Sequence, residues 1–230
     1  HLFGPLSTYM DHPEFPVGKG FKYVQERYDA EVKFTDQHVG KILDGLRAAG
    51  LAENTAVVVF SDHGEAFGEH KLGGEALYFH GEALYNEVLK VPLLIYVPGM
   101  TPRVVTERAM LIDMAPTVLE LAGVARPGSF RGRSLLAAMR GEATPGPLPP
   151  AYAEMLPCTA WQKNERVLIN TVGGEELAIY AKYTDNLTEL YSLADDATQQ
   201  RNVSSKKPEQ TRAMQQALAP YLRIKPDGGR

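Results

Sequence analysis

The sequence predicts an α/β fold followed by a small antiparallel sheet with a terminal helix. Apolar residues recur at helical spacing over Phe21–Gly50 and lead into the apolar run Ala56–Phe60, which indicates a helix–loop–strand unit. Because that run does not alternate with polar residues, it is typical of a strand buried on both faces in the centre of a parallel sheet. Beyond Ala151, two strand-like segments flank Gly173–Gly174, which is a hairpin signal.

The segment after the apolar run is expected to be irregular before regular structure resumes. Gly64–Gly81 is rich in glycine and polar residues, and it predicts a long functional loop. A short helical piece is expected at Leu84–Lys90, and a second buried strand at Val91–Val97. Asp113 is expected to be the N-cap of a helix that runs to Leu121.

The C-terminal part has a different character, which suggests two domains. Arg126–Pro150 carries many prolines and glycines and is the expected linker. We therefore divide the sequence into an α/β part at 1–140 and a small α+β part at 151–230. In the second part, Leu187–Leu193 is a further strand candidate, and Pro208 opens the last helix.

Composition excludes several classes of function. The 230 residues are 44% hydrophobic and 23% charged with a net charge of −4, which gives no basic footprint for nucleic acid. No apolar run approaches the roughly 20 residues of a membrane helix. The one cysteine, Cys158, excludes an internal disulfide framework and a Cys-based zinc site. Because the chain begins at His1 without methionine, we expect its true start to lie upstream.

Asp62 and His63 are the candidate metal ligands. They follow the apolar run directly, and ligands of open α/β sheets bind beyond the carboxyl ends of the strands. A carboxylate oxygen and an imidazole nitrogen suit Ca²⁺, Mn²⁺ or Zn²⁺, depending on the other ligands. Gly64 is expected to let the backbone turn tightly behind them. A solvated surface turn is the alternative.

His80 is the candidate catalytic and substrate-binding residue of the following segment. It could donate a proton or a hydrogen bond to an anionic substrate or leaving group, although a loop histidine is often only exposed. His70 lies in the same segment. Glu65 and Glu69 could orient a metal-bound histidine, and solvated carboxylates are the simpler alternative.

Taken together, these motifs resemble the sulfatase family of the alkaline-phosphatase-like superfamily. The match covers nearly the whole chain, in order and at family-like spacing. It is carried by the segments Tyr28–Glu31, Thr55–Glu65, Gly68–His70, His80–Leu93, Asp113–Gly123, Gly132–Leu135 and Thr188–Asp195.

The resemblance implies both a fold and a site. The fold is a mixed, largely parallel sheet sandwiched by helices, with a smaller antiparallel sheet and helix at the C-terminus. In the family, a divalent metal, often Ca²⁺, holds the sulfate beside a formylglycine nucleophile made from Cys or Ser. Asp62 and His63 match metal ligands, and His80 matches a residue that contacts the substrate and assists the leaving group. His1 belongs to a segment that binds substrate.

The chain also departs from the family pattern. The N-terminal metal carboxylates and the Cys/Ser-x-Pro-x-Arg nucleophile motif are absent from the 230 residues. The chain therefore resembles the C-terminal portion of a longer enzyme, with formylglycine expected upstream. Leu6 stands where members place a second substrate-contacting histidine.

The resemblance leaves several functions open. The first is hydrolysis of a small-molecule or glycan sulfate ester. The alternatives within the superfamily are a phosphonate or phosphodiester hydrolase, or a transferase of phospho-head-groups. A non-catalytic relative is the third possibility, and Leu6 motivates it. Family resemblance implies a periplasmic, extracellular or membrane-attached location, which the sequence itself leaves unknown.

Overall fold

The computed structural model describes residues 12–18, 21–72, 74–80, 84–143, 148, 151–155, 166–170, 176–181 and 187–218. The chain divides into two compact units. The first is His1–Phe60 with Leu93–Met100, and the second is Ser61–Pro92 with Thr101–Arg230. The division of the sequence into domains at 1–140 and 151–230 stays a prediction.

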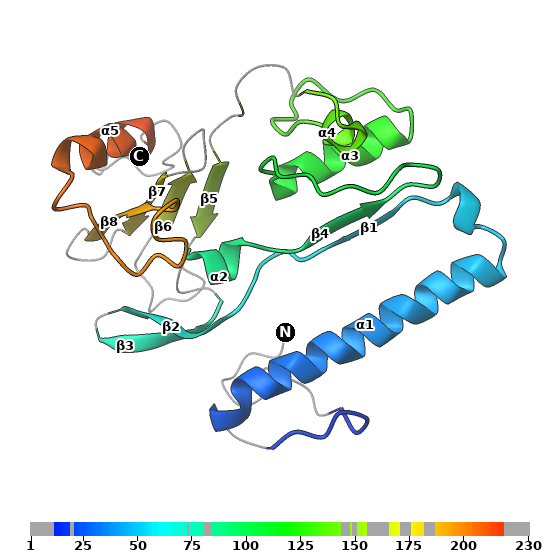
Figure 1. Cartoon of the computed structure of the whole chain (residues 1–230), viewed down its shortest axis with the longest axis horizontal. Coiled ribbons are helices and arrows are strands. Elements are labelled where there is room, and N and C mark those ends of the chain that lie inside the picture. The colour runs from blue at the N-terminus through cyan, green and yellow to red at the C-terminus, as the bar shows by residue number, and fades with distance from the viewer. Residues whose placement is uncertain are drawn as a thin grey trace. The chain divides into compact units, whose positions relative to one another are not determined.

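The first unit contains the predicted long helix. After a 3-10 turn, η1 (Phe21–Tyr23), the helix α1 runs over Val24–Ala48 (Figure 1). It ends as expected, because Gly50 adopts a φ of +68°, a left-handed conformation that glycine reaches without steric cost. The 3-10 turn η2 (Ala52–Asn54) then leads to the strand β1 (Val57–Phe60).

β1 pairs with β4 (Leu93–Tyr96), and this pairing corrects one prediction. The two strands are antiparallel, with Val57 opposite Tyr96 and Phe60 opposite Leu93, whereas a parallel neighbour was expected for β1. Val59 and Phe60 are 37% and 48% exposed, so β1 is not buried on both faces among the described residues. An unalternating apolar run indicates apolar surroundings, but it carries no information about the direction of the neighbouring strand.

The second unit begins with a hairpin where an irregular loop was predicted. Strands β2 (Ala66–Leu72) and β3 (Glu75–Phe79) pair in antiparallel fashion, with a register shift between Phe67 and Lys71. Gly68, at a φ of +95°, lies inside that shift. Because a bulge interrupts the two-residue periodicity, the strand pattern could not be recognised in the sequence. The predicted short helix follows as α2 (Asn86–Leu89).

Asp113 is the N-cap residue of the next helix, as predicted, although its side chain makes no capping hydrogen bond to that helix. The 3-10 turn η3 (Leu111–Asp113) leads into α3 (Met114–Leu121), which ends where predicted. The Asp113 carboxylate is 1% exposed and accepts the backbone N–H groups of Met110 and Arg133, both at 2.9 Å. It therefore ties the start of α3 to the turn before the short helix α4 (Leu136–Arg140).

The predicted antiparallel sheet and terminal helix are confirmed. The strands are β5 (Ala151–Met155), β6 (Arg166–Asn170), β7 (Glu176–Ala181) and β8 (Leu187–Ser192), and each pairs antiparallel with the next (Figure 1). The helix α5 (Pro208–Leu218) lies against β6 and β7. Among the described residues, no helix is long and apolar enough to cross a bilayer.

A buried apolar cluster joins this sheet to the hairpin. It consists of residues from β3, from the turn before α2 and from β8: Leu77, Leu84, Tyr85 and Tyr191, each at most 5% exposed. Leu89 of α2 packs against this cluster. Because the cluster holds α2 against β8, it fixes the backbone on which the candidate site rests.

Candidate active site

The candidate metal ligands lie in the turn that follows β1. Asp62 is 79% exposed at its side chain, and His63 is 28% exposed. Local hydrogen bonds define the turn: the Ser61 hydroxyl donates to the His63 carbonyl at 2.7 Å, and the His63 N–H donates to Asp62 Oδ1 at 3.1 Å. The sequence-predicted pair is therefore held in one turn at the start of the second unit.

The geometry of the pair fits two ligands of one cation. Nδ1 of His63 lies 2.8 Å from the Gly64 carbonyl oxygen, which can only accept, so Nδ1 carries the proton and Nε2 is the ligand nitrogen. That Nε2 lies 3.8 Å from Asp62 Oδ1. Two atoms that each bind a cation at about 2.0–2.6 Å can have this separation. Among the described residues, no group of three or more His, Cys, Asp or Glu side chains gathers as a metal site.

α2 supports this turn through Gly64. The Gly64 N–H donates to the Val88 carbonyl at 2.6 Å, and a Cβ atom at Gly64 would lie 2.0 Å from the Glu87 carbonyl oxygen. Gly64 is therefore required by the close approach of α2. The expected reason, freedom to turn, is not the operative one, because Gly64 is not among the glycines with positive φ.

The hairpin brings His80 to the same turn. Ala66 at the start of β2 pairs with Phe79 at the end of β3, so the next residues outward, Glu65 and His80, lie opposite each other. The rings of His63 and His80 are stacked with centroids 3.8 Å apart. His80 is half-buried, with 28% of its side chain exposed. The structure thus brings together Asp62, His63 and His80, whereas His1 and Leu6 lie outside the described residues.

Glu65 and Glu69 differ in their burial and in their contacts. Glu65 is 5% exposed at its side chain, and its Oε1 lies 3.0 Å from Nδ1 of His80. Glu69 is exposed and accepts the N–H of Phe67. Sequence reasoning missed the Glu65–His80 pair because it depends on the register of a hairpin that was not predicted.

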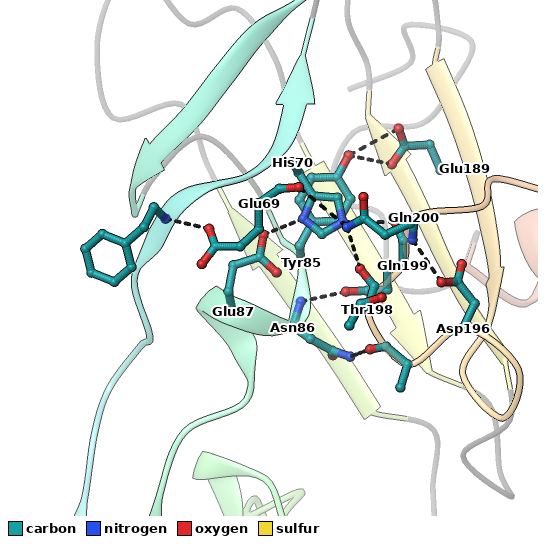
Figure 2. A network of polar contacts seen from close by, with 12 residues as sticks. Glu69, His70, Tyr85, Asn86, Glu87, Glu189, Asp196, Thr198, Gln199 and Gln200 are labelled. Atoms are coloured by element: carbon teal, nitrogen blue, oxygen red, sulfur yellow. Dashed lines mark hydrogen bonds and ion pairs between the residues drawn. The ribbon is translucent and has the colours of Figure 1, made fainter. Parts of the chain in front are cut away.

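A third histidine, His70, is the centre of a buried polar network that sequence reasoning also missed (Figure 2). His70 is 7% exposed; Nδ1 lies 2.5 Å from Glu87 Oε1, and Nε2 lies 2.9 Å from the Gln199 carbonyl oxygen. Its ring stacks on that of Tyr85 with centroids 3.8 Å apart. The Tyr85 hydroxyl donates to Glu189 of β8 at 3.0 Å. The network therefore links β2, α2 and the segment after β8.

The surroundings of His70 favour its charged form. Burial by itself lowers the pKa of His70, but the hydrogen bonds to Glu87 and Gln199 raise it. The negative charges of Glu87 and Glu189 raise it further, and the net pKa lies above the usual value. The Gln200 amide nitrogen, 3.2 Å from Nε2, also donates to the Thr198 carbonyl. The carboxylate and the carbonyl are acceptors at the two ring nitrogens, and they favour a proton on each.

Similar proteins identify the fold around this site. The "Sulfatase" family profile matches residues 9–124, and the "N-sulphoglucosamine sulphohydrolase, C-terminal" profile matches residues 74–224. Arylsulfatase K of Bos taurus is 30% identical over 225 residues, which cover 93% of this chain and 40% of that protein. The chain thus spans less than half the length of this curated relative.

Solved structures agree at the level of the fold. A protein solved in complex with its substrate D-glucosamine-2-N,6-O-disulfate has a TM-score of 0.71 and 24% identity, over 87% of this chain and 40% of that one. Phosphonate monoester hydrolase of Agrobacterium radiobacter has a TM-score of 0.67 and 18% identity, over 86% of this chain and 41% of that one. The alkaline-phosphatase-like α/β fold is confirmed, and the chain belongs to the sulfatase family.

Proposed function

We propose that the protein containing this chain is a metal-dependent sulfuric-ester hydrolase whose active site includes Asp62, His63 and His80. The observation that carries the proposal is the meeting of these three side chains at one turn, with the two imidazole rings stacked at 3.8 Å. Family membership supports sulfate-ester chemistry. Because a structural neighbour was solved with a disulfated glucosamine as its substrate, a sulfated sugar is the substrate class we propose.

Each residue has a distinct role in this proposal. Asp62 Oδ1 and His63 Nε2 hold a divalent cation, with Ca²⁺ as the first candidate and Mn²⁺ or Zn²⁺ as alternatives. The bound cation supplies positive charge that offsets the charge of the sulfate group. His80 contacts the substrate and donates a hydrogen bond to the oxygen that leaves with the alcohol. The remaining ligands and a formylglycine nucleophile come from outside these 230 residues.

The isolated chain is accordingly expected to be inactive. It spans 40% of the length of its bovine relative, and its described residues supply two candidate ligands. Two ligands hold a cation weakly, because structural and catalytic sites in proteins use about three or more protein ligands. Turnover of 4-nitrophenyl sulfate by the purified 230 residues would contradict this part of the proposal.

The experiment that tests the function compares hydrolysis by the full-length wild type and its His80→Ala variant. The substrates are 4-nitrophenyl sulfate, a sulfated glucosamine and a phosphonate monoester. We expect the wild type to release sulfate, and His80→Ala to lose about 10²–10⁴-fold in turnover, the usual contribution of a general acid. His38→Ala, an exposed histidine of α1, is the matched control. Cleavage of the phosphonate alone would contradict the proposed sulfatase function.

A further inference from the structure

Glu65 is a buried carboxylate at the open end of the β2–β3 hairpin, next to the first paired residue of β2. Its side chain is 5% exposed, and its Oε1 lies 3.0 Å from Nδ1 of His80. Buried carboxylates are rare unless they are paired, because leaving water costs free energy that a partner must offset. An ionised carboxylate can only accept, so Nδ1 of His80 carries a proton and donates a hydrogen bond to Glu65.

The backbone next to His80 is held in an unusual conformation. Phe79, the last residue of β3, has a φ of +66°, a region that bulky residues with a Cβ rarely occupy. Such a conformation is energetically unfavourable and persists only where the surroundings determine it. Because Phe79 still pairs with Ala66, this bend directs the chain at the point where His80 leaves the ladder.

The imidazole of His80 is therefore fixed in two ways. Its Nδ1 is hydrogen-bonded to Glu65, and its face is stacked on His63 with centroids 3.8 Å apart. We propose that Glu65 is the positioning residue of His80: it fixes the Nδ1–H tautomer of the neutral ring and the ring orientation, so that Nε2 faces the substrate and, when it also carries a proton, donates to the leaving oxygen. The second half of this proposal rests on the proposed function, whereas the tautomer does not.

The first test is a double-mutant cycle in the full-length enzyme with 4-nitrophenyl sulfate and phenyl sulfate. We expect Glu65→Ala to lower kcat at least tenfold with little change in KM, and to lower it more for phenyl sulfate, whose leaving group is poorer. Glu65→Gln, which keeps an acceptor oxygen, is expected to recover part of the loss. In a His80→Ala background, Glu65→Ala should cost nothing further.

One control variant and two contrary outcomes accompany this test. Glu69→Ala removes a neighbouring carboxylate that bonds the Phe67 N–H, and we expect it to leave kcat unchanged. If Glu65→Ala and His80→Ala combine additively, Glu65 acts independently of His80 and the positioning role is refuted. An equal loss for both leaving groups together with a raised KM would also refute it.

The second test separates the positioning role from the proposed function. The ¹⁵N chemical shifts of the His80 ring show which nitrogen carries the proton, whether or not the enzyme turns over a sulfate ester. We expect the Nδ1–H tautomer in the wild type and in Glu65→Gln, and its loss in Glu65→Ala. An Nε2–H tautomer in the wild type would overturn the inference. Absence of sulfate release with the Nδ1–H tautomer present would overturn only the proposed function.

Discussion

The pair formed by His70 and Glu87 should make local stability depend on pH. Substitution of Glu87 by Gln keeps the size of the side chain and an acceptor oxygen, but it removes the negative charge that lies 2.5 Å from Nδ1 of His70. Both side chains are largely buried, at 7% and 14% exposed, so solvent screens their interaction little. The substitution therefore isolates the charge of the pair from its packing.

The charged contact between His70 and Glu87 determines how much stability the substitution should remove and at which pH. A hydrogen bond to a charged group contributes about 1.5–3 kcal/mol and a neutral one about 0.5–1.5 kcal/mol. Because Gln keeps an acceptor oxygen, we expect Glu87→Gln to lose the difference, about 1 kcal/mol, at pH 5.5. The pKa of His70 is raised in the folded state, so the folded protein binds this proton more tightly than the unfolded chain. The stabilisation is fully present below the unfolded pKa of about 6.5 and is lost as pH rises through the folded pKa.

The assay is amide hydrogen exchange in the full-length protein, because it measures local opening even where global unfolding is not two-state. Peptides from β2 and α2 and from the segment 193–200 report on the network. After correction for intrinsic exchange rates, the wild type should open more readily as pH rises above 6.5. Glu87→Gln should open more readily than the wild type at pH 5.5, with a smaller difference at pH 9.

Other charged or titratable groups face His70 and must be considered in this experiment. The charge of Glu189 of β8 raises the pKa of His70. Asp196 is also close to His70, and the charge of His70 contributes to lowering the pKa of Asp196. Both stay in the variant, so part of the pH dependence should remain. His38→Gln, at an exposed histidine, controls for general effects of pH. An equal loss at pH 5.5 and pH 9, or none at pH 5.5, would refute the reasoning.

Two further substitutions test the packing around the site. Gly64→Ala should destabilise by about 1–3 kcal/mol, because its Cβ would lie 2.0 Å from the Glu87 carbonyl oxygen; Gly45→Ala, in open space on α1, should stabilise by about 1 kcal/mol. Asp113→Ala should cost about 1–3 kcal/mol for each of the two N–H groups that it leaves without an acceptor. Asp44→Ala, 76% exposed, should cost less than about 0.5 kcal/mol. Thermal and urea unfolding measure all four, and equal effects within either pair would contradict the packing described.

Elements with an uninterrupted period were predictable from the sequence. The helix α1 ends at Ala48, shortly before Gly50 as expected, and α3 and the strands β6, β7 and β8 lie where their apolar spacing indicated. The strand β5 was not predicted. The β2–β3 hairpin was not predicted, because the bulge around Gly68 breaks its alternation. The antiparallel pairing of β1 was also missed, since pairing direction depends on a partner far along the chain.

In the candidate site, too, the residues that are adjacent in sequence could be predicted and the contacts between distant residues could not. Asp62 and His63 were recognisable because they are adjacent in sequence and follow an apolar run. The partner of His80 was not recognisable, because Glu65 is 15 residues away and reaches it only through the hairpin register. His70 and Glu87 are likewise 17 residues apart.

The central claim is that Asp62 and His63 bind a divalent cation, and metal analysis of the full-length protein tests it most directly. Wild type, Asp62→Ala, His63→Ala and the exposed control Asp44→Ala are dialysed alike, and bound Ca²⁺, Mn²⁺ and Zn²⁺ are measured by mass spectrometry. We expect the wild type and Asp44→Ala to retain a bound metal ion, and both site variants to lose most of it. Full metal content in Asp62→Ala and His63→Ala would contradict the account.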